Sequence, residues 1–190
     1  KRCLATRALG SAEAVFANGD FLAARTRELA PKARVIPLLL GIDPNRHCPG
    51  SPDESPVRIV CARGFLPVYN NEYLIQGLSL LPEDVQDFEV EFLAQGPALE
   101  EARSLADNIL PAARRRKVRF LNGVSSDKWV ETIQKSHIYV TLSRSDGTSS
   151  SLLEALSCGL FPVASDIPQN REWISEEKKN GLLVPLDQPE

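Results

Sequence analysis

The chain has 190 residues, of which 43% are hydrophobic, and these values predict one large folded domain together with part of a neighbouring one. Its formal net charge of −3 and its isoelectric point near 5.5 exclude the broad basic surface of a nucleic-acid-binding protein, so no nucleic-acid partner is expected. No apolar run approaches the ~20 residues that a membrane span needs, and the first residues show no signal-peptide pattern.

Short β-rich runs alternate with helical stretches along the chain. The expected strands cover residues 14–17, 34–40, 57–62, 88–94, 118–121, 138–142, 161–164 and 182–184. The expected helices cover residues 21–30, 71–80, 98–108, 126–136, 149–158 and 170–175. Strands separated by about 10–15 residues of helical pattern form βαβ units. The sequence therefore predicts an α/β fold with a doubly wound, Rossmann-like parallel sheet that is covered on both faces.

Residues 41–56 interrupt this alternation. They contain four prolines and two glycines without periodicity, as expected of a loop or an interdomain connection. We therefore predict that residues 1–43 are the tail of a preceding N-terminal domain plus this connection, and that residues 44–190 form one α/β domain. The chain contains no methionine, and no helix follows the last expected strand. We expect a piece of a longer protein that is also truncated at its C-terminus.

The four cysteines form no C-x-x-C pair and have no neighbouring histidine, so their spacing predicts no metal site. Cys61 and Cys158 lie in apolar contexts, which predicts reduced core thiols in a cytoplasmic protein. The basic run at residues 114–117 is interpreted as a solvated loop or helix end. His137 is interpreted as structural, and His47 as an exposed residue of the connection.

Ligands of an open parallel sheet bind beyond the carboxyl ends of its strands. The loops at that edge are residues 63–70, 95–97, 122–125 and 143–148. In the last of these, Gly147 allows the backbone to approach a ligand closely. The amides of Thr148 to Ser151 at the following helix start form an anion site, with Thr148 or Ser149 as the N-cap. A capped helix start without a ligand explains the same residues equally well.

Glu154 favours the interpretation as a site. It follows Asp146 by eight residues and lies in a helix whose other residues are largely apolar. A carboxylate accepts two hydrogen bonds from a vicinal diol. One acid beside a sugar and one beside a ribose would suit a sugar nucleotide.

The acid pair Asp146 and Glu154, followed by Ala155, Gly159 and the run 161–166 (FPVASD), resembles the signature of the family-four, or group 1, GT-B glycosyltransferases. That signature is an E-x7-E pair followed by EAMA-x-G-x-PVVAS. Other segments are similar to motifs of the same family in the same order, namely residues 12–15, 36–43, 60–63, 95–97, 120–124 and 181–184.

The resemblance implies a retaining glycosyltransferase of the hexosyltransferase type, with two Rossmann-like domains. This chain would supply the donor-binding half, and the acceptor, a glycan or a lipid-linked sugar, would bind in the cleft. The implied partners are a nucleoside-diphosphate sugar as donor substrate, with no cofactor and no metal, and the missing N-terminal domain. Through that domain the protein would associate peripherally with the inner membrane face, in the cytoplasm, in polysaccharide biosynthesis. The isolated chain would be inactive.

Carried over by position, Asp146 and Arg63 are the candidate catalytic residues. Asp146 would hold the donor sugar, and Arg63 would neutralise the leaving diphosphate, a role that suits a guanidinium. Glu154 would bind the ribose hydroxyls. The remaining candidate contacts are Gly147, Thr148 and Ser149 for the sugar, Ser150 for phosphate, and Gly96, Gly123 and Val124 around the base.

The sequence departs from the family at two positions. Asp146 stands where the family has glutamate, so the carboxylate is one methylene shorter. Tyr69 stands nearest the family's diphosphate-binding lysine and would donate a hydrogen bond to phosphate without neutralising it. Arg63 alone, or a cation such as Arg144 or Arg171, would then balance the diphosphate. A non-catalytic nucleotide-binding module and a GT-B sugar-nucleotide epimerase remain alternatives.

Overall fold

The computed structural model describes residues 2–175 and 177–186. The chain divides into two compact units. The first unit contains residues 1–41 with 146–150, and the second contains residues 42–145 with 151–190. No helix in the described ranges has the length and apolar character to cross a membrane.

The first unit is a small α/β arrangement. Its elements are α1 (Arg2–Ser11), β1 (Val15–Ala17), α2 (Asp20–Leu29) and β2 (Val35–Pro37). The two strands are parallel, with Val15 opposite Val35. The expected strand over residues 34–40 is shorter than predicted, and Leu38 to Leu40 are about half exposed. Helix α1 was not predicted, since its sequence has no clear apolar stripe.

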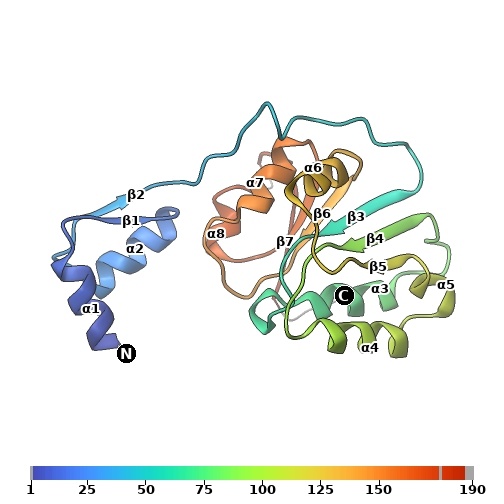
Figure 1. Ribbon diagram of the computed structural model, residues 1–190, viewed down its shortest axis with the longest axis horizontal. Helices are drawn as coiled ribbons and strands as arrows, with labels where there is room; N and C mark the ends of the chain where they lie inside the picture. The colour runs from blue at the N-terminus through green and yellow to red at the C-terminus, as the bar shows by residue number, and fades with distance from the viewer. Residues whose placement is uncertain (1, 176, 187–190) are drawn as a thin grey trace. The chain divides into compact units, whose positions relative to one another are not determined.

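The second unit is built on a six-stranded, fully parallel sheet (Figure 1). Its strand order is β5-β4-β3-β6-β7-β8. Counted within the unit, this order is that of the dinucleotide-binding Rossmann fold. The predicted doubly wound, Rossmann-like sheet is therefore confirmed. The strands are β3 (Val57–Cys61), β4 (Phe88–Phe92), β5 (Val118–Phe120), β6 (Ile138–Thr141), β7 (Phe161–Ser165) and β8 (Leu182–Val184).

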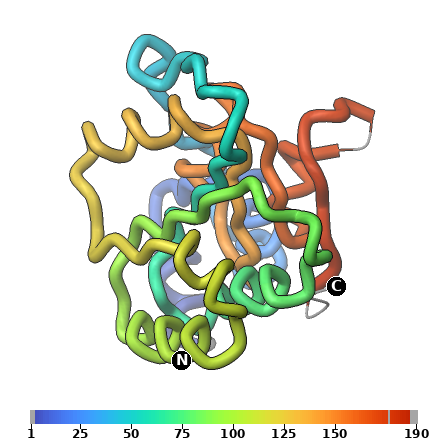
Figure 2. Tube along the Cα trace, turned by 90° about the vertical axis from the view of Figure 1, so that its right-hand side faces the viewer, coloured from blue at the N-terminus to red at the C-terminus, as the bar shows by residue number. Residues whose placement is uncertain are grey.

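Helices lie on both faces of this sheet. Helices α3 and α4 lie on one face, and α6 and α7 lie on the other (Figure 1, Figure 2). The helical elements are η1 (Pro67–Tyr69), α3 (Asn71–Leu80), α4 (Leu99–Ile109), α5 (Ala112–Arg115), α6 (Ser126–Gln134), α7 (Ser150–Ser157) and α8 (Pro168–Arg171). The helix expected over residues 170–175 begins earlier because Pro168 occupies its first turn, where a missing amide hydrogen costs little.

Two hydrophobic clusters fill the space between the sheet and its helices. Because side chains alternate along a strand, Val60 and Cys61 of β3 enter different clusters. Cys61 packs with the α3 and α4 side, and Val60 packs with Tyr139, Leu152 and other residues of the α6 and α7 side. Cys61 and Cys158 are buried and free, as the sequence predicted.

Arg114 corrects the interpretation of the basic run as fully solvated. Its side chain is only 5% exposed, and its guanidinium donates to four backbone carbonyls where α3 ends. The last carbonyls of a helix have no partner within the helix, so a cation there satisfies them. The four acceptors belong to Leu78 (3.3 Å), Ser79 (3.1 Å), Leu81 (2.6 Å) and Pro82 (2.8 Å).

Candidate functional site

The connections that leave β3 and β6 diverge from the middle of the sheet. The two strands are neighbours, yet β3 leads to α3 on one face and β6 leads to α7 on the other. Such a point opens a crevice at the carboxyl edge, where ligands of this architecture bind. Arg144 ties the two connections together, since its amide donates to the carbonyl of Val68 at 2.8 Å and its guanidinium to Asn70 at 3.1 Å.

Arg63 lies just beyond the end of β3, in a loop that a buried asparagine braces. Asn71 donates to the carbonyls of Arg63 and Gly64, both at 3.1 Å, and accepts from the Cys61 thiol at 3.4 Å. Burial raises the pKa of Cys61 to about 11, so this thiol stays protonated at neutral pH. The Arg63 guanidinium lies 4.1 Å from the centre of the Tyr69 ring. The loop therefore holds the guanidinium stacked on an aromatic face.

The loops after β3 and β4 interlock through their backbones. Phe65 donates its amide hydrogen to the Gln95 carbonyl at 3.0 Å and accepts from the Ala98 amide at 3.1 Å. Gly96 lies in this contact, and a Cβ there would meet the Phe65 carbonyl oxygen at 2.4 Å. Only glycine fits such a close approach between backbones.

The loop after β5 joins the same edge. The Gln95 side chain donates to the Asn122 carbonyl, and Gly123 adopts a φ of +82° beside that side chain. Glycine is suited to this left-handed conformation. The loop then runs to Ser125, which accepts from the Lys128 amide and caps α6.

Gly123 and Val124 line a hollow of about 440 Å³ at this edge. Its walls come from the ends of β3, β4 and β5 and from the starts of α6 and α7. The other lining residues are Ala62, Leu93, Ala94, Ser126, Trp129 and Ser151. Gly123 and Val124, which the sequence predicted to contact the base, thus line the same hollow as Trp129, which the sequence did not predict there. Gly96 lies in a separate, more open hollow with Gln95, Leu99 and Asn122.

The Glu154 carboxylate is held by α6 and by the connection before β3. Its Oε2 accepts a hydrogen bond from the Trp129 indole nitrogen at 2.6 Å, and its Oε1 lies 3.8 Å from Nε2 of His47. The Glu154 side chain is 21% exposed, so the acid points neither fully into solvent nor into the core. In the same region, the Tyr139 hydroxyl and the Ser151 hydroxyl are 2.7 Å apart.

The acidic loop after β6 belongs to the first compact unit. Asp146 accepts from the Gly147 amide at 2.9 Å. The Thr148 carbonyl accepts from the Asn18 side chain at 3.0 Å, and Thr148 and Ser149 are buried. Ser150 is exposed and is the first residue of α7.

Three other sequence interpretations can be compared with the structure. His47 is buried at 8% exposure, not exposed, because it packs beside Glu154 and its carbonyl accepts from Ser157. His137 is structural, since its Nδ1 accepts from the Arg58 amide at 3.0 Å. Arg171 already binds Asp166 through two hydrogen bonds, which hold the pKa of Asp166 below its usual range. In this structure Arg171 is therefore paired with an acid at the surface.

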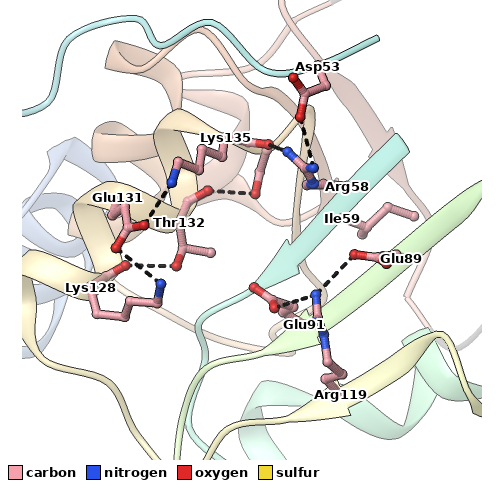
Figure 3. A pocket seen from close by; sticks show the side chains of 11 residues that line it. Asp53, Arg58, Ile59, Glu89, Glu91, Arg119, Lys128, Glu131, Thr132 and Lys135 are labelled. Carbon is pink, nitrogen blue, oxygen red and sulfur yellow. Dashed lines mark hydrogen bonds and ion pairs between the residues drawn. The ribbon is translucent and has the colours of Figure 1, made fainter. Parts of the chain in front are cut away.

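A third hollow, which is polar and has a volume of about 360 Å³, lies between the sheet and α6 (Figure 3). Its charged groups neutralise one another. Arg119 pairs with Glu89 at 3.0 Å and Glu91 at 2.9 Å, and Glu131 pairs with Lys128 of α6 and with Lys135 directly after that helix. It contains none of the candidate residues, and paired charges of this kind are typical of a solvated surface. Within the described residues, no group of histidine, cysteine or acidic side chains could hold a metal ion.

Trp129, Asn71 and His47 are the residues near the site that sequence reasoning missed. Trp129 and His47 contact Glu154, which lies 25 and 107 positions further along the chain, whereas Asn71 contacts residues 7 to 10 positions before it. Nothing in their local spacing points to these contacts. The one available signal was the fold itself, because the starts of α6 and α7 belong at the same sheet edge as the candidate loops.

The family model of the group 1 glycosyl transferases matches residues 45–190. A GDP-mannose:cellobiosyl-diphosphopolyprenol alpha-mannosyltransferase of Xanthomonas oryzae pv. oryzae is 27% identical over 175 residues, which cover 91% of this chain and 44% of that protein. This chain thus spans less than half of that relative's length. A structure of Anabaena Alr3699/HepE in complex with UDP-glucose matches with a TM-score of 0.84 at 15% identity, over 99% of this chain and 54% of that one. A C-terminal domain of a group 1 family protein from Francisella tularensis matches with a TM-score of 0.67 at 16% identity, over 78% of this chain and 82% of that one.

Proposed function

We infer the function of this chain from its family, because the chain belongs to the group 1 glycosyl transferases. We propose that it binds the nucleoside-diphosphate sugar from which the whole protein transfers a sugar to an acceptor. The observation that carries this proposal is the hollow at the carboxyl edge of the sheet, with Glu154 held beside it through Trp129.

In this proposal each ligand group faces chemistry that suits it. The nucleobase lies in the hollow against Gly123 and Val124, and Glu154 accepts hydrogen bonds from the ribose hydroxyls. Arg63 takes the diphosphate, and its stacking on Tyr69 limits the directions in which the guanidinium can point. Tyr69, in the place of a lysine, adds a hydrogen-bond donor but no charge.

In this proposal the loop at residues 146–150 binds the donor sugar. Asp146 binds the sugar hydroxyls together with the backbone of Gly147, Thr148 and Ser149, and Ser150 contacts phosphate. We propose that transfer retains the configuration of the sugar, with Arg63 and Asp146 stabilising charge that develops on the leaving diphosphate and on the sugar ring. The acceptor is a glycan or a lipid-linked sugar bound by the rest of the protein, in the cytoplasm.

Nucleotide titration of the chain tests the donor proposal. Unfolding is followed with increasing UDP, GDP or ADP, and one of them should raise stability by about 2.7 kcal/mol at a hundredfold excess over its Kd. Glu154→Ala and Arg63→Ala should each lower the affinity about tenfold or more, since each removes charge-assisted hydrogen bonds. Glu83→Ala and Arg116→Ala, at exposed positions, are the matched controls.

Two results would contradict the proposal. Absence of any shift with all of the nucleotides would remove the donor site, and unchanged affinity in Glu154→Ala would remove its role with the ribose. Sugar-nucleotide turnover by the full-length protein separates a transferase from a non-catalytic nucleotide-binding module. Release of the epimeric sugar nucleotide instead would identify an epimerase.

A further inference from the structure

We propose that Trp129 is a positioning residue that orients the Glu154 carboxylate for the ribose of the bound nucleotide. The inference rests on the proposed function, since it takes Glu154 as the ribose-binding acid. It adds a residue outside the acid pair and on a different helix, and it assigns separate roles to the two carboxylate oxygens.

The geometry divides the carboxylate into a held oxygen and an available one. Oε2 accepts from the Trp129 indole nitrogen at 2.6 Å, a short hydrogen bond to a charged acceptor. The Nε2 atom of His47 lies 3.8 Å from Oε1, beyond hydrogen-bond length. The side chain of Glu154 keeps 21% exposure. A ligand hydroxyl can therefore reach Oε1 while Oε2 stays fixed.

The indole is itself held in place, as an orienting group must be. Trp129 lies in the first turn of α6, and the Ser125 hydroxyl caps that turn. Its ring meets the Tyr139 ring edge-on, with centres 6.4 Å apart, and Tyr139 is fully buried. The Tyr139 hydroxyl in turn contacts Ser151 of α7 at 2.7 Å. The sheet and both helices thus fix the direction of the indole N–H.

Trp129 also lines the hollow that contains Gly123 and Val124. The residue that orients the acid is therefore a wall of the proposed base pocket, and base and ribose are joined in one ligand. A different interpretation is that the hydrogen bond only satisfies a half-buried carboxylate and an indole N–H. The two interpretations differ in one respect: only the first expects that losing the Trp129 hydrogen bond weakens binding through the ribose hydroxyls.

Trp129→Phe tests this difference, because it removes the N–H and keeps an aromatic ring. The affinities of wild type and variant are measured for UDP, GDP and ADP and for their 2′,3′-dideoxy counterparts. For the nucleotide that binds best, Trp129→Phe should weaken the ribose form about fivefold and leave the dideoxy form unchanged. Trp173→Phe is the matched control, since the buried Trp173 indole nitrogen has no hydrogen-bond partner among the described residues. It should change neither affinity.

A double-mutant cycle completes the test. In the Glu154→Ala background, Trp129→Phe should have no further effect on the ribose form. Should Trp129→Phe fail to fold, Trp129→Leu provides the comparison, because leucine also removes the N–H and adds no donor, and the dideoxy form registers any loss of packing.

The outcomes separate the two proposals. Equal weakening of ribose and dideoxy forms by Trp129→Phe would reduce Trp129 to a packing residue and overturn the inference. Unchanged affinity in Trp129→Phe, with weakened binding in Glu154→Ala, would overturn the inference and leave the proposed function standing. If the wild type binds no nucleotide, or if Glu154→Ala binds the nucleotide with unchanged affinity, the proposed function is overturned instead.

Discussion

Replacing Arg114 by alanine should destabilise the second unit by about 3 kcal/mol. The change removes the donor of four backbone carbonyls at the end of α3. Leu81 and Pro82 are partly or fully exposed, so water can replace the guanidinium at their carbonyls. The carbonyls of Leu78 and Ser79 are more enclosed, and leaving each without its donor lowers the free energy of unfolding by about 1–1.5 kcal/mol. Loss of the positive charge at the helix C-terminus adds about 0.5 kcal/mol.

Urea unfolding followed by circular dichroism measures this effect, with the free energy extrapolated linearly to water. Arg116→Ala is the matched control, because Arg116 is an exposed arginine two positions away and should change stability by less than about 0.5 kcal/mol. Arg114→Lys should fall between the two, since one ammonium cannot reach four carbonyls. If Arg114→Ala matches Arg116→Ala at an unchanged m-value, the buried hydrogen bonds contribute nothing and the reasoning is wrong.

Two further predictions concern the carboxyl edge of the sheet. Gly96→Ala should destabilise the chain by about 2 kcal/mol, because the new Cβ forces apart the backbones joined at Phe65. Gly41→Ala is the control and should leave the free energy of unfolding unchanged in the same assay, because nothing lies within 4 Å of its Cβ. Equal stability of the two variants would refute the steric argument. The second is a pH effect. Burial raises the pKa of Cys61 from 9.0 to about 11, so the unfolded thiol loses its proton first and the contribution of Cys61 is full below pH 9 and falls as the pH rises toward 11. The gap in unfolding free energy between wild type and Cys61→Ala should therefore narrow by about 2 kcal/mol from pH 8 to pH 10.5, and a constant gap would contradict it.

Periodicity was sufficient to predict the sheet of the second unit. All but the last of its strands are followed by a turn and a helical pattern, and apolar runs such as those of β6 and β7 have few alternatives to a buried parallel sheet. The strand expected over residues 34–40 was too long, because three leucines in a row do not by themselves supply a neighbouring strand. Helix α5 escaped prediction because four residues are too few for a helical period to show.

The candidate site was predictable only in its outline. The loops at the carboxyl edge followed from the strand pattern, since every parallel strand ends at the same side of the sheet. The burial of Arg114 and the contact between Trp129 and Glu154 did not follow. Both join residues more than twenty positions apart, and a single sequence contains no local signal for such a pair.

The contact between the loops after β3 and β4 is made by main-chain atoms. Phe65, Gln95 and Ala98 meet through backbone amides and carbonyls, so other side chains at these positions could keep the same hydrogen bonds. This is one way in which a chain 15% identical to the Anabaena protein can superimpose on it with a TM-score of 0.84. In evolutionary terms, the frame formed by these main-chain hydrogen bonds can keep its geometry while its sequence changes. Any ligand preference at this edge then depends on the few side chains that project from that frame.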